Sequence, residues 1–158
     1  MQLLDRNFDV SVSPVAGAEL SEQALLTGLT DEELTDLASL ASIRTYQASE
    51  KIIASGDPAT SVFFLRSGVV HVTLPDGIRL ATLTAGMPFG EMALLEPHRS
   101  ADVFADMAAT AYEIPLRDFE RFRKQHPRAG ERIMRNLAQL LADRLILANA
   151  KVNLLTPS

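Results

Sequence analysis

The stretch VVHVTLPDGIRLATL, residues 69–83, contains two short apolar runs separated by Pro75, Asp76 and Gly77. These three residues accept the backbone angles of a tight turn, so the stretch predicts a β-hairpin. Short strands separated by turn residues predict a mainly β fold with flanking helices, in which residues from about 43 to 115 form a jelly-roll-like β-roll. The strands are expected at residues 43–47, 51–54, 61–66, 69–74, 78–83, 100–105 and 111–114.

Helical patterns flank this region. Residues 30–33, Thr-Asp-Glu-Glu, form a capping-box pattern that predicts a helix from Thr30 to about Ala41. Pro127 suits the first turn of a long helix. In chain order we expect a linker or flexible arm (1–18) and a single domain (19–158). The domain contains a short helix (19–26), the capped helix and the β-roll with a short helix inserted at 90–95. It ends with lid or dimer helices over 116–125 and 128–155.

Composition excludes several classes of protein. The chain of 158 residues has no cysteine, which rules out disulfides, thiolate nucleophiles and zinc–thiolate sites. It has no apolar run of the roughly 20 residues that a membrane span requires, and Asp5 and Asp9 make the N-terminus unlike a signal peptide. We therefore expect a cytoplasmic protein without a membrane span. Most basic residues lie after Pro115, but the net charge of −5 and the lack of a recognition helix argue against direct nucleic-acid binding.

One segment departs from the strand pattern around it. FGEMALL, residues 89–95, contains helix formers and no β-branched residue, and RSA, residues 99–101, follows closely. The first N–H groups of a helix attract an anion, Gly90 allows the backbone to approach a ligand, and the planar fork of Arg99 suits two phosphate oxygens. Taken singly, Gly90 could simply begin a helix and Arg99 could lie on the surface. In this order, the residues predict a phosphate site.

Glu91 indicates what else the ligand carries. A carboxylate beside a bound phosphate repels it, so this residue needs another purpose, and carboxylate oxygens accept hydrogen bonds from hydroxyl groups. An anion receptor next to such an acceptor suits a phosphate that is fused to a ribose. A cyclic nucleotide has this structure.

The segments 89–95 and 99–101 resemble the phosphate-binding cassette of the cyclic-nucleotide-binding family, which includes the catabolite activator protein and kinase regulatory subunits. The resemblance covers about residues 30–155. It implies a non-catalytic regulatory sensor with cAMP or cGMP as the ligand and with no cofactor or metal. It includes the glycines at positions 56, 68, 77, 86 and 90.

The resemblance also implies roles for individual residues. Glu91 would bind the ribose hydroxyl, Arg99 the cyclic phosphate, and the region of Gly90, Ser100 and Ala101 would add phosphate contacts. The other ligand-binding candidates are Phe89 and Ala93 in the cassette, Val72, Leu80, Met92 and Val103 around the purine, Arg144 as the partner of Glu91, and Asn149 near the base.

The last helix is the expected moving part. From Ile133 to Leu155, apolar residues recur at spacings of three, four and seven, which is more than one docking surface on a lone helix needs. We expect this helix to close over the ligand, to form a homodimer through residues 128–155, or to pack against an effector domain. Asn149, from its own chain or from a neighbouring subunit, could bind an adenine amino group, which favours cAMP over cGMP.

Two other functions are compatible with parts of the sequence. Residues 81–86 and 99–103 are similar to domains appended to bacterial glutaminases and sulfate-permease-type transporters, so the chain could be a regulatory module of a larger enzyme or transporter. A cupin-like metal enzyme shares the β-roll but uses clustered histidines. Here His71, His98 and His126 are scattered along the chain, so catalysis is not expected.

Overall fold

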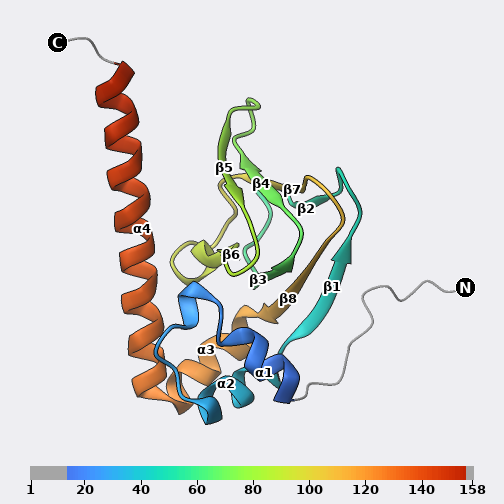
Figure 1. Cartoon of the computed structure of the whole chain (residues 1–158), viewed down its shortest axis with the longest axis vertical. Coiled ribbons are helices and arrows are strands. Elements are labelled where there is room, and N and C mark those ends of the chain that lie inside the picture. The colour runs from blue at the N-terminus through green and yellow to red at the C-terminus, as the bar shows by residue number, and fades with distance from the viewer. Residues whose placement is uncertain (1–13, 156–158) are drawn as a thin grey trace, which may run out of the picture.

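The computed structural model describes residues 14–155, and its centre is a β-roll of two sheets (Figure 1). Each sheet has four antiparallel strands, in the orders β1-β8-β3-β6 and β2-β7-β4-β5. The predicted fold class is confirmed. The first sheet consists of β1 (Ser42–Tyr46), β8 (Ala109–Pro115), β3 (Ser61–Ser67) and β6 (Pro88–Phe89), and the second of β2 (Lys51–Ile53), β7 (Asp102–Ala105), β4 (Val70–Thr73) and β5 (Arg79–Leu83).

The strand β3 connects the two hydrophobic cores of the protein. Successive side chains of a strand point to opposite faces, so its residues alternate between the cores. Phe63 and Leu65 belong to the cluster between the two sheets, whereas Val62 and Phe64 belong to a second cluster that the helices cover. Because both faces of β3 are covered, the run of buried residues at 61–65 is continuous.

The capped helix and the last two helices lie where the sequence predicts them. α2 (Asp31–Ala38) follows Thr30, whose hydroxyl accepts a hydrogen bond from the Glu33 N–H at 3.1 Å, while the Glu33 carboxylate accepts one from the Thr30 N–H at 2.8 Å. The helix ends at Ala38 rather than near residue 41. α3 (Leu116–Gln125) and α4 (Pro127–Leu155) complete the set. In Figure 1, α1 to α3 gather at one end of the roll and α4 rises along its side.

The N-terminal region differs from its prediction. Instead of one helix over residues 19–26, the structure has α1 (Pro14–Leu20) and a 3-10 helix, η1 (Ala24–Leu26). The end of the expected linker is therefore helical, and residues 1–13 lie outside the described residues. A Cβ at Gly17 would lie 3.3 Å from Thr35 Oγ1, so this glycine allows close packing of α1 on α2 rather than marking a linker.

The long helix α4 is packed unevenly. Ile133 and Leu137, in its first half, are fully buried. Leu145, Ile146 and Leu147, in its second half, are 62%, 65% and 62% exposed. Neither α4 nor any other helix within residues 14–155 combines the length and the hydrophobicity of a bilayer-spanning segment.

Candidate ligand-binding site

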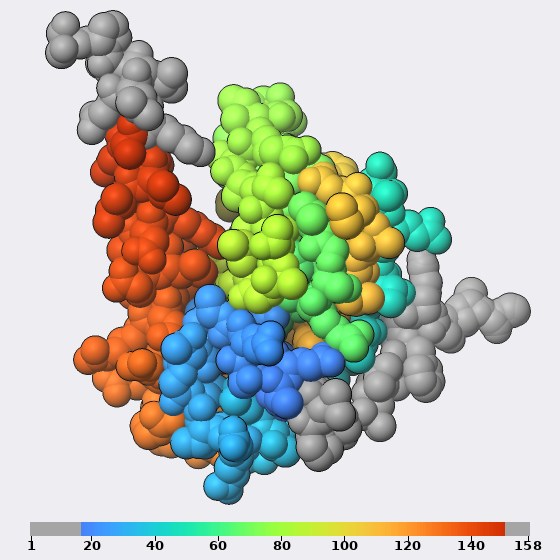
Figure 2. Space-filling model, viewed as in Figure 1, coloured from blue at the N-terminus to red at the C-terminus, as the bar shows by residue number. Residues whose placement is uncertain are grey.

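A cavity of about 710 Å³ lies between the β-roll and α4. Its wall includes β5, the segments 89–93 and 98–101, and the α4 residues Arg144, Leu147 and Ala148. Figure 2 shows the surface hollowed between the second half of α4 and the hairpin of β4 and β5. Ligand pockets of about 300–1,000 Å³ hold small molecules, so a nucleotide-sized ligand can fit. The site residues expected from the sequence that line this cavity are Val72, Leu80, Phe89, Gly90, Glu91, Met92, Ala93, Arg99, Ser100, Ala101, Val103 and Arg144.

Gly90 brings the backbone close to Arg99. It has a left-handed conformation with φ of 69° and precedes η2 (Glu91–Leu94), a 3-10 helix. A Cβ at this position would lie 3.0 Å from Arg99 Nη1 and 3.1 Å from the Phe63 ring, so the left-handed conformation favours glycine and a larger residue would have to displace these neighbours slightly. The helix expected over residues 90–95 is therefore shorter than predicted. A single 3-10 turn has little dipole, so the attraction of an anion depends more on Arg99 than the sequence suggests.

Arg99 is fixed at the same end of the cavity. Its Nη1 donates to the Gly90 carbonyl at 2.8 Å and its Nη2 to the Ser61 carbonyl at 2.7 Å. The loop that carries it is held by backbone hydrogen bonds of 2.8 Å, one from the Arg99 N–H to Asp57 O and one from the Gly56 N–H to Arg99 O. The guanidinium therefore converges on the start of η2, as the sequence predicts.

The charge of Arg99 is only partly compensated. Its two hydrogen-bond acceptors are carbonyl oxygens rather than carboxylates. Burial lowers the pKa of the Arg99 guanidinium from its ordinary value, and the carboxylates of Glu91 and Glu113 act in the opposite direction. Because arginine stays protonated in proteins, the cavity contains a partly buried cation. The N–H donors of Arg99 that its two carbonyl partners do not use can bind an anion.

Glu91 connects the same segment to α4. Its side chain is buried, with 4% exposure of the residue, and its Oε2 accepts a hydrogen bond from Arg144 Nη1 at 2.8 Å. A buried carboxylate without a partner is strongly unfavourable, so the ion pair with Arg144 stabilises the buried side chain of Glu91. The pairing expected between Arg144 and Glu91 is present, and it attaches the second half of α4 to the cavity wall.

The strand β5 contributes residues that the sequence does not predict. In a regular strand only alternate side chains face one side, yet every residue of β5 lines the cavity. The register is broken once in this strand, because Val72 pairs with Ala81 whereas the next residue, Thr73, pairs with Arg79. Leu80 is therefore the extra residue of a β-bulge, which redirects neighbouring side chains. Arg79 pairs with Thr73 and contacts Thr82 and Asp106, so its guanidinium lies on the face of the sheet opposite to the side chains of Val72 and Ala81.

One residue that the sequence assigns to the site does not reach the cavity in a single chain. Asn149 is exposed on α4 and is not part of the cavity wall. Its contact with a base across a subunit boundary stays a prediction. His98, Leu147 and Ala148 line the cavity although the sequence does not assign them to it. The last two follow Arg144 by three and four residues, so the helical spacing could have identified them.

The histidines occupy three separate environments. His71 pairs with Asp106, His126 Nε2 lies 3.4 Å from Asp36 Oδ2, and His98 lines the cavity. Within residues 14–155, no group of three or more His, Cys, Asp or Glu side chains is arranged to hold a metal ion. The described histidines therefore make individual contacts rather than one common site.

Comparison with known proteins identifies both a family and a relative. Residues 43–126 match the family model described as the cyclic nucleotide-binding domain. Over 138 residues the chain is 75% identical to Glutaminase 1 of Bradyrhizobium diazoefficiens, and the match covers 87% of this chain and 22% of that relative. The chain thus spans about a fifth of the length of this relative.

Solved structures show the same architecture. The catabolite activator protein of Thermus thermophilus superposes with a TM-score of 0.70 at 32% identity, covering 84% of this chain and 63% of that one. A cyclic nucleotide-binding domain from Methylobacillus flagellatus superposes with a TM-score of 0.82 over 99% of this chain and 98% of that one. Its identity of 18% limits this second likeness to the fold.

Proposed function

Because this chain belongs to the cyclic nucleotide-binding domain family, we propose that it is a regulatory module that binds a cyclic nucleotide and performs no catalysis itself. One observation carries the proposal. The partly buried guanidinium of Arg99 lines a cavity of nucleotide size, and its own hydrogen bonds go to carbonyl oxygens rather than to carboxylates. The cyclic phosphate of the ligand would bind Arg99 and the backbone near Gly90, Ser100 and Ala101.

The rest of the ligand would contact other parts of the wall. Glu91 uses Oε2 for Arg144, which leaves Oε1 to accept the ribose hydroxyl. The purine would pack on the apolar side chains of Val72, Leu80, Met92 and Val103, all of which line the cavity.

The proposed output is movement of α4. Ligand binding would order the segment 89–101 and bring the second half of α4 over the cavity, while Phe119 and Phe122, which are buried on α3, repack at its base. A ligand shifts such an equilibrium only through its differential affinity for the closed form, typically about 1–3 kcal/mol. Hydrogen exchange of α4 that did not change on ligand binding would contradict this mechanism.

The parent protein is proposed from the similarity to Glutaminase 1. That relative is 75% identical in the matched region and much longer than this chain, so the module would regulate a glutaminase-type enzyme rather than a transporter. We also propose a cytoplasmic location, where cyclic nucleotides act as signals. Adding cAMP or cGMP to the full-length parent and measuring glutamine hydrolysis tests this assignment, and an unchanged rate would refute it.

Dimerisation is proposed from the exposed part of α4. Leu145, Ile146 and Leu147 are exposed there, and a second copy of the helix would cover them, through residues 128–155. Asn149 could then reach the base from the neighbouring subunit, which is the arrangement that the preference for cAMP requires. Sedimentation of wild type and of Leu145→Glu would test it, because the variant should stay monomeric where the wild type dimerises.

Calorimetric titration tests the binding site itself. Wild type should bind a cyclic nucleotide more tightly than non-cyclic AMP, and Arg99→Ala should lose about 2–5 kcal/mol, or roughly 30-fold or more in affinity. Arg117, which is exposed on α3 and outside the cavity, provides the matched control. Arg117→Ala should bind as the wild type does. Since Arg99 also binds Ser61 O, a thermal melt must show that Arg99→Ala is folded, and equal binding by the folded variant and wild type would refute the site.

A further inference from the structure

Arg99 is bound to the loop 54–60, which connects β2 to β3. Its backbone exchanges two hydrogen bonds of 2.8 Å with this loop, because its N–H donates to Asp57 O and its carbonyl oxygen accepts from the Gly56 N–H. Its side chain donates to the carbonyl oxygen of Ser61, the residue directly after the loop. The position of the guanidinium therefore depends on where the loop 54–60 lies.

Asp102 fixes the start of this loop. Its Oδ1 accepts a hydrogen bond from the Ser55 N–H at 2.7 Å. The next N–H, that of Gly56, donates to Arg99 O, so two consecutive backbone donors of the loop bind the segment that carries Arg99. A hydrogen bond to a carboxylate is roughly twice as strong as one between neutral groups, and the Asp102 side chain is only 16% exposed. The carboxylate therefore holds the loop against this segment.

The Asp102 side chain lies on the opposite face of the sheet from the cavity. Asp102 is the first residue of β7 and precedes Val103, whose buried side chain belongs to the core between the sheets and lines the cavity. Successive side chains of a strand point to opposite faces. Asp102 is accordingly not part of the cavity wall, and its Oδ1 lies 3.8 Å from Lys51 Nζ instead. It can act on a ligand only through the loop or through its charge.

Resting on the proposed function, we propose that Asp102 is a positioning residue for the binding of the cyclic phosphate. It holds the loop 54–60, and the loop holds Arg99 at the cavity wall. A group that is already fixed in its bound conformation binds a ligand without the cost of being ordered. Without the carboxylate, the loop and Arg99 would have to be ordered when the phosphate binds, which lowers the affinity.

The test is calorimetric titration of Asp102→Ala, Asp102→Val and Asp102→Asn with whichever of cAMP and cGMP the wild type binds more tightly. The first two variants remove the acceptor and should bind about 5- to 10-fold more weakly, the loss expected for one hydrogen bond. Valine suits a strand, so it guards against a folding defect of the alanine variant, and thermal melts identify the folded proteins.

Asp102→Asn separates the loop from the charge. It removes the charge but keeps a carbonyl oxygen for the Ser55 N–H, so its affinity should stay within about threefold of wild type. If the charge of Asp102 acted directly on the phosphate, all three variants would bind more tightly than wild type, and the inference would be overturned. Lys51→Met removes the charged neighbour of Asp102 and should bind within about twofold of wild type, as the control.

A double-mutant cycle with Arg99→Lys distinguishes positioning from a general structural role. Lysine keeps the charge but is a flexible point charge without the planar fork, so it gains little from a fixed loop. In this background, Asp102→Val should change the affinity by less than about twofold. Equal weakening in both backgrounds would mean that Asp102 supports the fold in general, and the inference would fail.

The outcomes separate this inference from the function on which it rests. If wild type binds a cyclic nucleotide and the folded Asp102→Ala and Asp102→Val bind it as tightly, the inference fails and the proposed function stands. If wild type binds neither nucleotide, both fail. Weaker binding by both removal variants, retained binding by Asp102→Asn and coupling to Arg99 together would support the positioning role.

Discussion

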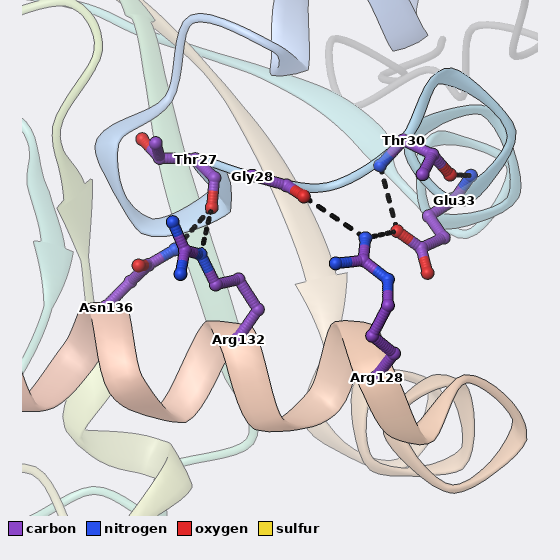
Figure 3. Close-up of polar contacts among 7 residues, drawn as sticks. All are labelled: Thr27, Gly28, Thr30, Glu33, Arg128, Arg132 and Asn136. Carbon is purple, nitrogen blue, oxygen red and sulfur yellow. Dashed lines mark hydrogen bonds and ion pairs between the residues drawn. The ribbon is translucent and has the colours of Figure 1, made fainter.

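The two halves of α4 are held by different kinds of contact. In the first half, side chains of α4 donate hydrogen bonds to the segment 27–33 (Figure 3). Arg128 binds Gly28 O at 3.1 Å and the Glu33 carboxylate, Arg132 binds Thr27 O at 3.2 Å, and Asn136 binds Thr27 O at 2.8 Å. In the second half, Arg144 bonds to Glu91, and the apolar side chains of residues 145–147 are exposed.

This difference indicates how one helix can serve two purposes. The first half is an anchor, since it adds Ile133 and Leu137 to the core and joins the N-terminal segment to the helix. Residues 142–150 of the second half include no buried side chain, which is typical of elements that move on ligand binding. Movement of the second half can therefore be measured against a stationary first half of the same helix.

The largest difference between the halves should appear when one leucine is removed from each. Leu137 is 1% exposed and Leu145 is 62% exposed. At protein concentrations where the chain is monomeric, Leu137→Ala should lower the free energy of unfolding by about 2–5 kcal/mol because it leaves a cavity, and Leu145→Ala should change it by less than about 0.5 kcal/mol. Urea denaturation of the two variants measures this. Similar losses in both would show that the second half is also packed in solution.

The ion pair of the second half gives the next largest effect. Arg144→Ala leaves the buried Glu91 carboxylate without its partner, which should cost about 1–3 kcal/mol. Hydrogen exchange should become faster over residues 142–150 and stay unchanged over 129–141. Arg135→Ala removes an exposed arginine from the same helix, 3.7 Å from Glu131, and serves as the control. Faster exchange along the whole helix would contradict the division into two halves.

The sequence predicts the parts of this arrangement that depend on local pattern. The capping box at Thr30 and Glu33 uses residues three positions apart, and Gly90, Glu91 and Arg99 lie within one short segment, so both could be recognised directly. The bulge at Leu80 depends on how β5 pairs with β4, which no local pattern specifies. The face of the sheet on which Arg79 lies could not be predicted for this reason.

Local sequence patterns also do not predict the long-range contacts to α4. The bond from Arg128 to Glu33 joins residues 95 positions apart, and the sequence shows only two charged helices. The Arg144–Glu91 pair is also long-range, with residues 53 positions apart. It is nevertheless expected, because the resemblance to a known family supplies the register that spacing alone does not.

The amide of Asn136 tests the anchor without removing a charge. Asn136 Nδ2 donates to Leu25 O at 2.9 Å and to Thr27 O at 2.8 Å. Asn136→Ala should lower the free energy of unfolding by about 1–2 kcal/mol, because Leu25 O loses its side-chain donor and Thr27 O keeps only the bond from Arg132. Gln139, an exposed amide on the same helix, donates to Asp143 within α4. Gln139→Ala should therefore be nearly neutral, and an equal effect of the two in denaturation curves would argue against the anchor.

The smallest effect should be a pH dependence of the anchor. Burial raises the pKa of Glu33, but its bonds with Arg128 and Thr30 outweigh this and lower the pKa below its ordinary value. A carboxyl whose pKa is lower in the folded state stabilises the fold above its unfolded pKa, about 4.3, and loses this contribution as the pH falls through the folded pKa.

Wild type should therefore be more stable than Glu33→Gln at pH 7, by at most about 1 kcal/mol because Arg128 is exposed. This difference should shrink as the pH falls below about 5, since protonation removes the same charge from the wild type. Glu32→Gln, at the exposed neighbouring position, should give a smaller difference at pH 7. A difference between wild type and Glu33→Gln that persisted in acid would mean that the carboxylate stabilises the anchor through its shape and its hydrogen bonds rather than through its charge.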